Sequence, residues 1–303
     1  MGLAECGTHA LLKVSAGACS DGEQTLAGGV VDALKDGMLC LADRGLYSFS
    51  PWNRARGTGA ELLWRMKSNQ RLPVLERFPD GSWRTEIFAS DDRKRQEGVS
   101  ARAIEYTVED PSRASSEARC RLLTTILDPE RAPAQELAPL YPQRRELEST
   151  LDELDVHQRG PRIVLRSKLP DLVTQELYGH LCVHYAIRWL MHAVALEGGH
   201  DPDRVSFTHA IRVARRTTGS HPGFSPRALR NAHRQAKAEL LHGLLPSRRL
   251  RTDPHVVKRK MSGCPVKRAE HRNPPKPTRR PQEATVILAA EPDGIGAGPP
   301  SRL

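Results

Sequence analysis

The sequence is poor in the features that mark secreted, zinc-binding or membrane-spanning proteins. Its six cysteines are scattered, with no C-x-x-C spacing, which argues against a zinc ribbon and against a disulfide framework. No basic segment followed by an apolar one opens the chain, so we expect no signal peptide. The most apolar stretch, Leu177 to Leu196, is interrupted by three histidines and one arginine and makes a poor membrane span. We therefore expect a protein of the reducing cytoplasm, with no membrane partner.

Positive charge, in contrast, is abundant and concentrated near one end of the chain. The formal net charge is +10 and the pI is near 9.6. Residues 248–280 hold twelve Lys or Arg and two acidic residues, a surplus that equals the net charge of the whole chain. Such a surplus favours a polyanionic partner, most commonly nucleic acid. The preference for arginine over lysine suits phosphate contacts but is equally typical of a GC-rich genome.

The apolar spacing of the first half predicts an α/β fold. Residues 4–16 alternate like a strand or hairpin, and Glu23 to Leu34 has helical spacing. Met38 to Ala42 is a short apolar run typical of a central strand buried on both faces. The run ends in Asp43, so that carboxylate lies at the carboxyl end of a strand, where ligands bind in open α/β sheets.

The segment that follows predicts more strands, including a small β-rich insertion over about 68–118. Ala60 to Met66 can form the next core strand after a short helix that begins at Ser50 and Pro51. Inside the insertion, two apolar runs flank a Pro79-Asp80-Gly81 turn signal. Arg121 to Leu127 then predicts a return to the core.

Beyond residue 134 the sequence predicts helices and then a disordered tail. Pro139 and Pro142 remove backbone donors, so the helix over Gln135 to Val156 should break and restart near Tyr141. Further helices are expected over Pro170 to Leu196, Phe207 to Thr217 and Ser225 to Leu241. The predicted organisation is an α/β domain over 1–198, a helical region over 199–245 and a basic, Pro-rich, disordered tail over 246–303.

Two carboxylates stand out by placement, Asp43 at the strand end and Glu148 in a helix after the next strands. Carboxylates brought together in this way can hold Mg²⁺ ions, which activate a water or a 3′-hydroxyl. Two carboxylates alone are too few ligands to define such a metal site. A solvated helix face is the ordinary explanation for any one glutamate. Glu176, His180 and His184 are spaced one turn apart and could present imidazoles to a metal, but a packed or surface helix explains them better.

Several blocks, in this order, resemble the DDE transposases of the IS4 type. Leu41 to Ser48 is similar to the block around the second catalytic aspartate of that family, and Ala60 to Asn69 to the strand after it. Tyr141-x-x-Arg144-x-x-x-Glu148 resembles the Y-x(2)-R-x(3)-E signature, whose glutamate is the third catalytic residue. The resemblance continues through Ile163 to Lys168, Glu176 to Met191 and Val257 to Lys260, and so covers nearly the whole chain.

The resemblance implies an RNase H-like α/β core with the β-rich insertion, and metal-dependent cleavage and strand transfer at transposon ends. It implies Asp43 and Glu148 as catalytic residues and as ligands of Mg²⁺ or Mn²⁺. The partner would be double-stranded DNA at the transposon ends, with a homodimer on the DNA as one arrangement, at the nucleoid of a bacterial cytoplasm. The DNA-binding residues would be Tyr141, Arg144, Lys258, Arg259 and Lys260.

Departures from the family pattern predict impaired or absent catalysis. The first catalytic aspartate of the family lies upstream of the block that Leu3 to Ala10 resembles, where this sequence has only Met and Gly. Asp155 occupies the position of the signature lysine and should repel DNA phosphate. Arg145 replaces the usual aromatic residue, and Pro142 lies inside the signature. An in-frame aspartate-bearing strand encoded upstream of the start codon would restore the missing carboxylate.

Two alternatives stay open at this point. One is a non-catalytic DNA-binding remnant that acts through its basic tail and through the face of the glutamate helix. The other is a fragment that folds poorly and melts without cooperativity.

Overall fold

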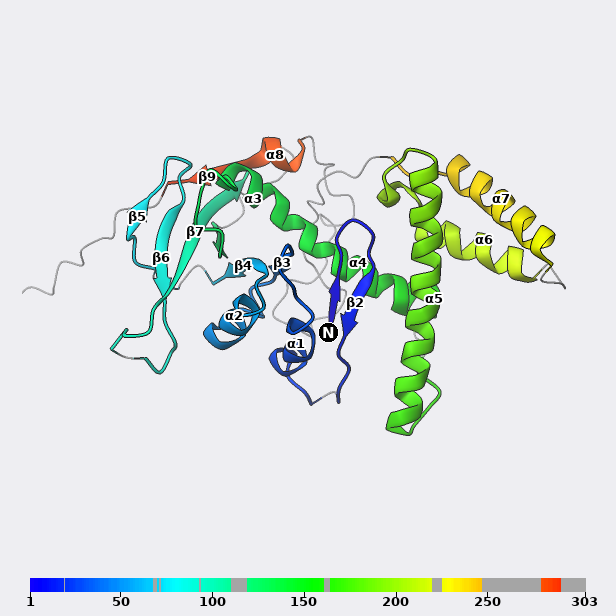
Figure 1. Ribbon diagram of the computed structural model, residues 1–303, viewed down its shortest axis with the longest axis horizontal. Coiled ribbons are helices and arrows are strands. Elements are labelled where there is room, and N and C mark those ends of the chain that lie inside the picture. Colours follow the sequence, from blue (N-terminus) through cyan, green and yellow to red (C-terminus); the bar gives the residue numbers. More distant parts are fainter. Residues whose placement is uncertain are drawn as a thin grey trace, which may run out of the picture. The chain divides into compact units, whose positions relative to one another are not determined.

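A computed structural model describes residues 1–18, 20–67, 70, 72–92, 94–109, 119–160, 164–219, 225–246 and 279–289. The chain forms two compact units, shown in ribbon form in Figure 1. Unit 1 comprises Met1–Ala33 and Gln143–Arg248, and unit 2 comprises Leu34–Pro142 and Arg249–Leu303. Each unit has its own core and is described separately below.

Unit 2 is built on one mixed sheet of seven strands in the order β3-β4-β8-β7-β6-β5, with β9 also paired to β7. β3 and β4 are parallel, and the other neighbours are antiparallel. The strands of the predicted insertion extend the same sheet rather than forming a separate one. The strands are β3 (Leu39–Ala42), β4 (Glu61–Met66), β5 (Glu76–Arg77), β6 (Trp83–Ile87), β7 (Val99–Val108), β8 (Cys120–Thr124) and β9 (Thr285–Leu288).

Helices pack on this sheet through large apolar side chains. From α2 (Phe49–Arg56), the fully buried Trp52 makes an edge-to-face contact with Trp64 of β4, at a ring distance of 5.4 Å. The helix α3 (Ala134–Leu140) contributes Leu137 to a cluster with Ile104 of β7 and Leu122 of β8. The short helix α8 (Pro281–Ala284) adds its Ala284 to the same cluster.

A buried arginine ties the turn before α3 to the sheet. Arg102 of β7 is fully buried and donates to the carbonyls of Ile126, Asp128 and Ala132 at 3.2, 3.0 and 2.7 Å. Its charge meets the Asp80 carboxylate at 3.2 Å, in the turn that the sequence predicted. Because burying a guanidinium is costly unless it is hydrogen-bonded, the contacts of its two Nη atoms fix the path of the chain that leads to α3.

Unit 1 is mainly helical, with a two-stranded hairpin of β1 (Gly2–Ala4) and β2 (Leu11–Val14). Its core packs Met191, Val194, Phe207, Ile211 and Leu240 from three helices. The helical segments are α1 (Glu23–Val31), the end of the 3-10 helix η1 (Tyr141–Arg145), α4 (Glu146–Asp152), the π-helix η2 (Glu153–Gln158), α5 (Pro170–Glu197), η3 (Pro202–Arg204), α6 (Phe207–Gly219) and α7 (Pro226–His242).

Most predicted elements are confirmed, and two expectations need correction. β3 was expected to be a central strand buried on both faces, but within the described residues it pairs with β4 alone and lies at the sheet edge. The tail over 246–303 was expected to be disordered throughout, yet residues 281–288 form α8 and β9, because Thr285–Leu288 completes ladder bonds with β7. None of the described helices is long and apolar enough to cross a membrane.

Candidate active site

Asp43 lies where the sequence predicts, directly after the last residue of β3, and its side chain is exposed. Its Oδ1 accepts a hydrogen bond from the backbone N–H of Arg44 at 2.7 Å, which orients the carboxylate at the strand end. The following turn is closed by a bond from the Leu46 N–H to the Asp43 carbonyl at 3.0 Å. An exposed, oriented carboxylate is thus presented at the carboxyl edge of the parallel strand pair.

Tyr141, the tyrosine of the signature, supports this strand end from inside unit 2. Its ring belongs to the buried core and is 2% exposed. Its hydroxyl donates to the carbonyl of Ala42 at 3.2 Å and lies 3.5 Å from Oδ1 of Asp43. Two blocks that are far apart in sequence therefore meet at Asp43. Both roles predicted for Tyr141, steadying the site and contacting DNA, stay predictions.

Arg65 is a neighbour of this site that the sequence analysis did not single out. In the parallel register Ala42 is paired with Trp64, so Arg65 is the next residue on β4, as Asp43 is the next after β3. Burial lowers the pKa of Arg65, but its ionisable neighbours, Cys120 first and Asp43 among the others, raise it above its ordinary value. Arginine is charged in any case, so the register brings a positive charge to the strand next to Asp43. The register of the two parallel strands, had it been known from the sequence, would have identified Arg65 as a neighbour of Asp43.

Glu148 lies in the first turn of α4, in unit 1, and its side chain is 69% exposed. One turn earlier, Nη1 of Arg144 is 3.7 Å from Oε1 of Glu148, a loose i,i+4 ion pair. A carboxylate in the first helical turn is favoured by the helix dipole. The glutamate is therefore accessible to a ligand, and Arg144 keeps a cation next to it.

Asp155 departs from the signature and was expected to repel DNA phosphate, but the structure pairs it with a cation. Its carboxylate is paired at 3.1 Å with Nη1 of Arg159, one turn later on the same helical segment. The expected repulsion of phosphate is therefore reduced, because the ion pair neutralises the charge of the carboxylate. Pro142 and Arg145 lie in the 3-10 turn η1, where Pro139 and Pro142 produce the predicted interruption near Tyr141.

Directly behind the Glu148 helix lies a buried ionic network that sequence reasoning missed. Glu153 is 7% exposed and accepts from Arg188 Nε at 2.9 Å, pairs again with Arg188 Nη2, and lies 3.1 Å from His184 Nε2. The Arg188 guanidinium also stacks near the Phe207 ring at 5.3 Å. The network joins the π-helix η2 to α5, so it holds the segment that continues the Glu148 helix. No single residue signalled it, since an isolated Glu or Arg looks solvated in a sequence.

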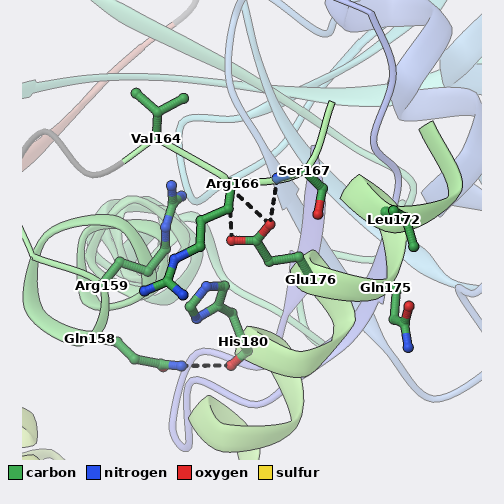
Figure 2. Close-up of a pocket in the computed structure, with 9 residues that line it drawn as sticks. All are labelled: Gln158, Arg159, Val164, Arg166, Ser167, Leu172, Gln175, Glu176 and His180. Carbon is green, nitrogen blue, oxygen red and sulfur yellow. Dashed lines mark hydrogen bonds between the residues drawn. The ribbon is translucent and has the colours of Figure 1, made fainter. Parts of the chain in front are cut away.

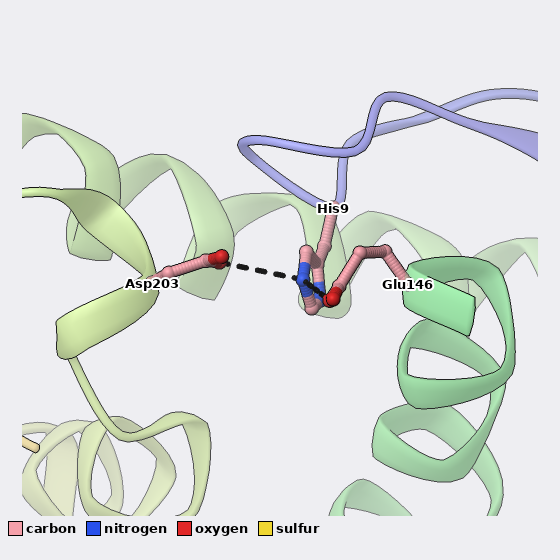
Figure 3. A group of neighbouring side chains, drawn as sticks. All are labelled: His9, Glu146 and Asp203. Atoms are coloured by element: carbon pink, nitrogen blue, oxygen red, sulfur yellow. Dashed lines mark ion pairs between the residues drawn. The ribbon is translucent and has the colours of Figure 1, made fainter. Parts of the chain in front are cut away.

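His9 extends the network to the hairpin and brings two more carboxylates together. Its backbone φ is +57°, a left-handed conformation uncommon for a non-glycine residue, and its imidazole is fully buried. Figure 3 shows the side chains of His9, Glu146 and Asp203 converging from three elements. His9 Nε2 is 2.6 Å from Glu146 and 3.5 Å from Asp203, and the three ligand atoms lie within 4.8 Å of one another.

The surroundings of the imidazole argue against a metal in this cluster. Arg188 Nη2 lies 2.5 Å from His9 Nδ1, and arginine has only donors, so Nδ1 must accept. In the neutral ring the proton is then on Nε2, where it faces Glu146 instead of offering a lone pair. Burial lowers the pKa of His9, but the carboxylates of Glu146 and Glu153 raise it above its ordinary value, which favours a ring that donates to them over one that binds a metal. The cluster is best described as a structural ion-pair network.

Other residues considered from the sequence have less to contribute here. Lys258, Arg259 and Lys260 lie outside the described residues. His184 belongs to the buried network, whereas Glu176 accepts backbone bonds from Arg166 and Ser167.

Comparison with known proteins identifies the class. Residues 5–185, more than half of the chain, match the transposase DDE domain, so the chain belongs to the DDE transposase family. It is 29% identical over 266 residues to the transposase InsG for insertion sequence element IS4 of Escherichia coli (strain K12). The match covers 84% of this chain and 58% of that protein, and it agrees with the IS4 type.

Proposed function

We propose that this chain acts on double-stranded DNA at transposon ends as an IS4-type transposase, with Asp43 and Glu148 as two of its metal-binding carboxylates on an RNase H-like core. The observation that carries the proposal is the contact between two signature blocks in unit 2. The hydroxyl of the signature Tyr141 bonds to Ala42 and lies 3.5 Å from Asp43. The same segment continues into the helix that presents Glu148.

The donor chemistry of the two residues fits Mg²⁺ or Mn²⁺. Both are carboxylates on exposed side chains, and hard oxygen donors are what these ions prefer. Asp43 is oriented by the Arg44 N–H, and Glu148 is only loosely paired with Arg144. When bound, the divalent ions of this enzyme class activate the attacking oxygen and stabilise the leaving one.

The surrounding residues of the chain then have separate tasks. Tyr141 holds the strand end in place, so that the Asp43 carboxylate keeps its orientation when a ligand approaches. Arg65 follows Trp64, the partner of Ala42 in the parallel register, and its positive charge lowers the cost of collecting negative charge at this strand end. Arg144 lies beside Glu148 and is placed to meet a phosphate of the bound strand, which carries the charge that arginine recognises.

We further propose that catalysis by the 303-residue chain alone is weak. The assignment gives it two carboxylates, whereas the site of this family is built from three. A divalent ion that loses one charged ligand of three is held less firmly. DNA binding does not depend on this ligand and should persist.

A duplex carrying the inverted repeat that borders the gene tests both parts. With Ca²⁺ we expect binding that weakens as salt rises, and with Mn²⁺ little nicking. Any nicking should disappear in Asp43→Ala and in Glu148→Ala, while Asp91→Ala, an exposed carboxylate of the insertion, should leave it unchanged.

A different result of this experiment would contradict the weak catalysis, the site assignment and the action on DNA. Efficient nicking by the wild-type chain would overturn the expected impairment. Nicking that survives both site substitutions would overturn the site assignment, and a chain that fails to bind the duplex would overturn the function.

A further inference from the structure

Unit 1 contains a pocket that lies outside the carboxylate site and that no role described so far uses. It has a volume of about 520 Å³ and lies where the end of η2 meets the segment before α5 and the first turns of that helix. Figure 2 shows the Arg166 side chain reaching toward the ring of His180, with the Arg159 side chain running alongside it. The polar lining is completed by Gln158, Ser167, Gln175 and Glu176.

The one carboxylate in the lining serves the backbone rather than the arginines. Glu176 accepts from the Arg166 N–H at 3.1 and 3.0 Å and from the Ser167 N–H at 3.1 Å. These bonds hold the pKa of Glu176 below its usual range. They also pin the residues before α5 against the helix, so that the Arg166 side chain is held over the pocket.

The lining of the pocket contains two arginines, Arg159 and Arg166, and a single carboxylate, that of Glu176. Among the described residues, no carboxylate forms an ion pair with the Arg166 guanidinium. Arg159 is paired with Asp155 through Nη1, and this carboxylate is 67% exposed and so lies toward solvent. A third arginine, Arg215 of α6, donates to the Gln158 carbonyl at 3.0 Å and adds positive charge behind the same segment. Guanidinium groups gathered in this way are stabilised by an anion with several oxygens.

We propose that this pocket holds a phosphate group of the DNA backbone, bound by Arg159 and Arg166 with His180 as a further donor. The proposal rests on the proposed action on DNA. Its position supports a backbone phosphate over a free one, because Arg159 directly follows the helical segment that carries Glu148. Glu148 and Arg159 are at most about 16 Å apart along that segment, because the π-helical part rises less per residue than an α-helix. This is at most about five base-pair steps of a duplex.

The ion pair between Asp155 and Arg159 also changes the effect expected of Asp155 on DNA binding. A carboxylate at the position of the signature lysine removes one cation, but it tethers Arg159 one turn further along. The phosphate contact is thereby moved along the helix instead of being lost.

Arg166→Gln in the full chain is the sharpest test, because the bonds to Glu176 come from the Arg166 backbone and survive the substitution. The matched control is Arg230→Gln, which removes the same charge from the exposed surface of α7. Two quantities are measured: the slope of log K against log salt for duplex binding, and the thermal stabilisation of the chain by inorganic phosphate.

We expect Arg166→Gln to lower the salt slope by about 1 and to weaken duplex binding about equally for all sequences. It should also abolish stabilisation by phosphate, and Arg230→Gln should match the wild type in both. An Arg166→Gln chain that matches the wild type in both would overturn the phosphate site while leaving the proposed function intact. A wild-type chain that is stabilised by phosphate through Arg166 but does not bind the duplex would overturn the proposed function and the DNA assignment.

Discussion

Replacing Glu153 by alanine should destabilise unit 1 by about 3–5 kcal/mol, the usual cost of leaving a buried charge without its partner. Arg188 is 4% exposed, and after the substitution it would keep only the His9 nitrogen and the face of Phe207. Hydrogen exchange of the α5 amides measures this loss locally, without interference from unit 2. Protection of His184 to Met191 should fall by the factor that corresponds to the lost free energy.

Two further variants separate charge burial from general damage to the helix. Asp155→Ala removes an exposed carboxylate two positions later and should cost under about 0.5 kcal/mol. A double variant with Met at both Glu153 and Arg188 should recover most of the stability, since it buries no charge. If Glu153→Ala cost no more than Asp155→Ala, the network would not be what fixes this segment.

The stability of unit 1 should also fall steeply as the pH is lowered. The pKa of Glu153 sets the pH range in which this happens. Burial alone would raise the pKa of Glu153, but the bonds from His184 and His9 and the charge of Arg188 lower it to about 2. The ordinary value is 4.5. A depressed pKa contributes stability that is present above the ordinary value and is lost as the pH falls toward 2. The loss should be about 3 kcal/mol.

The pH dependence is checked by unfolding the chain in urea at a series of pH values between 6 and 2. Glu153→Gln is the reference, because it removes this titration and leaves the exposed carboxylates unchanged. The difference between the two chains should shrink progressively below pH 4.5. A difference that stays constant over the whole range would show that Glu153 is not held ionised by its partners.

These effects bear on function through the position of Glu148. The Glu148 helix continues into η2, and η2 is held to α5 by Glu153 and Arg188. His9 joins the same network through the Arg188 contact and reaches Glu146, in the same turn as Glu148. The hairpin, the glutamate helix and α5 are thus locked together by ionic contacts inside unit 1.

Local signals predicted the fold well where they were strong. Pro170 at the start of α5, and the prolines around Tyr141, set boundaries that the structure reproduces, because proline acts on the backbone directly. The Thr285–Leu288 strand was missed, although its run of apolar residues is strand-like, because the charge and proline content around it dominated the prediction. Whether β3 is central or at an edge depends on which strands pair with it, which no short window reports.

The candidate site likewise has features that local sequence predicts and features that depend on tertiary contacts. The placement of Asp43 at a strand end followed from an apolar run and a turn. Its contact with Tyr141, and the proximity of Arg65, depend on the packing of α3 and on strand register. The burial of His9 and Glu153 could not be predicted, because tertiary contacts decide whether an ion pair is solvated or enclosed. The catalytic and DNA-binding roles of the signature residues remain predictions.

Titration of the chain with Mn²⁺ tests the central claim, that Asp43 and Glu148 are metal-binding carboxylates. The number and affinity of bound ions can be followed by electron paramagnetic resonance of the free ion, with no need for DNA. We expect the wild-type chain to bind Mn²⁺ and both Asp43→Asn and Glu148→Gln to bind it at least about 10-fold more weakly, with Asp91→Asn unchanged. Equal binding by the wild-type chain and both site variants would contradict the assignment.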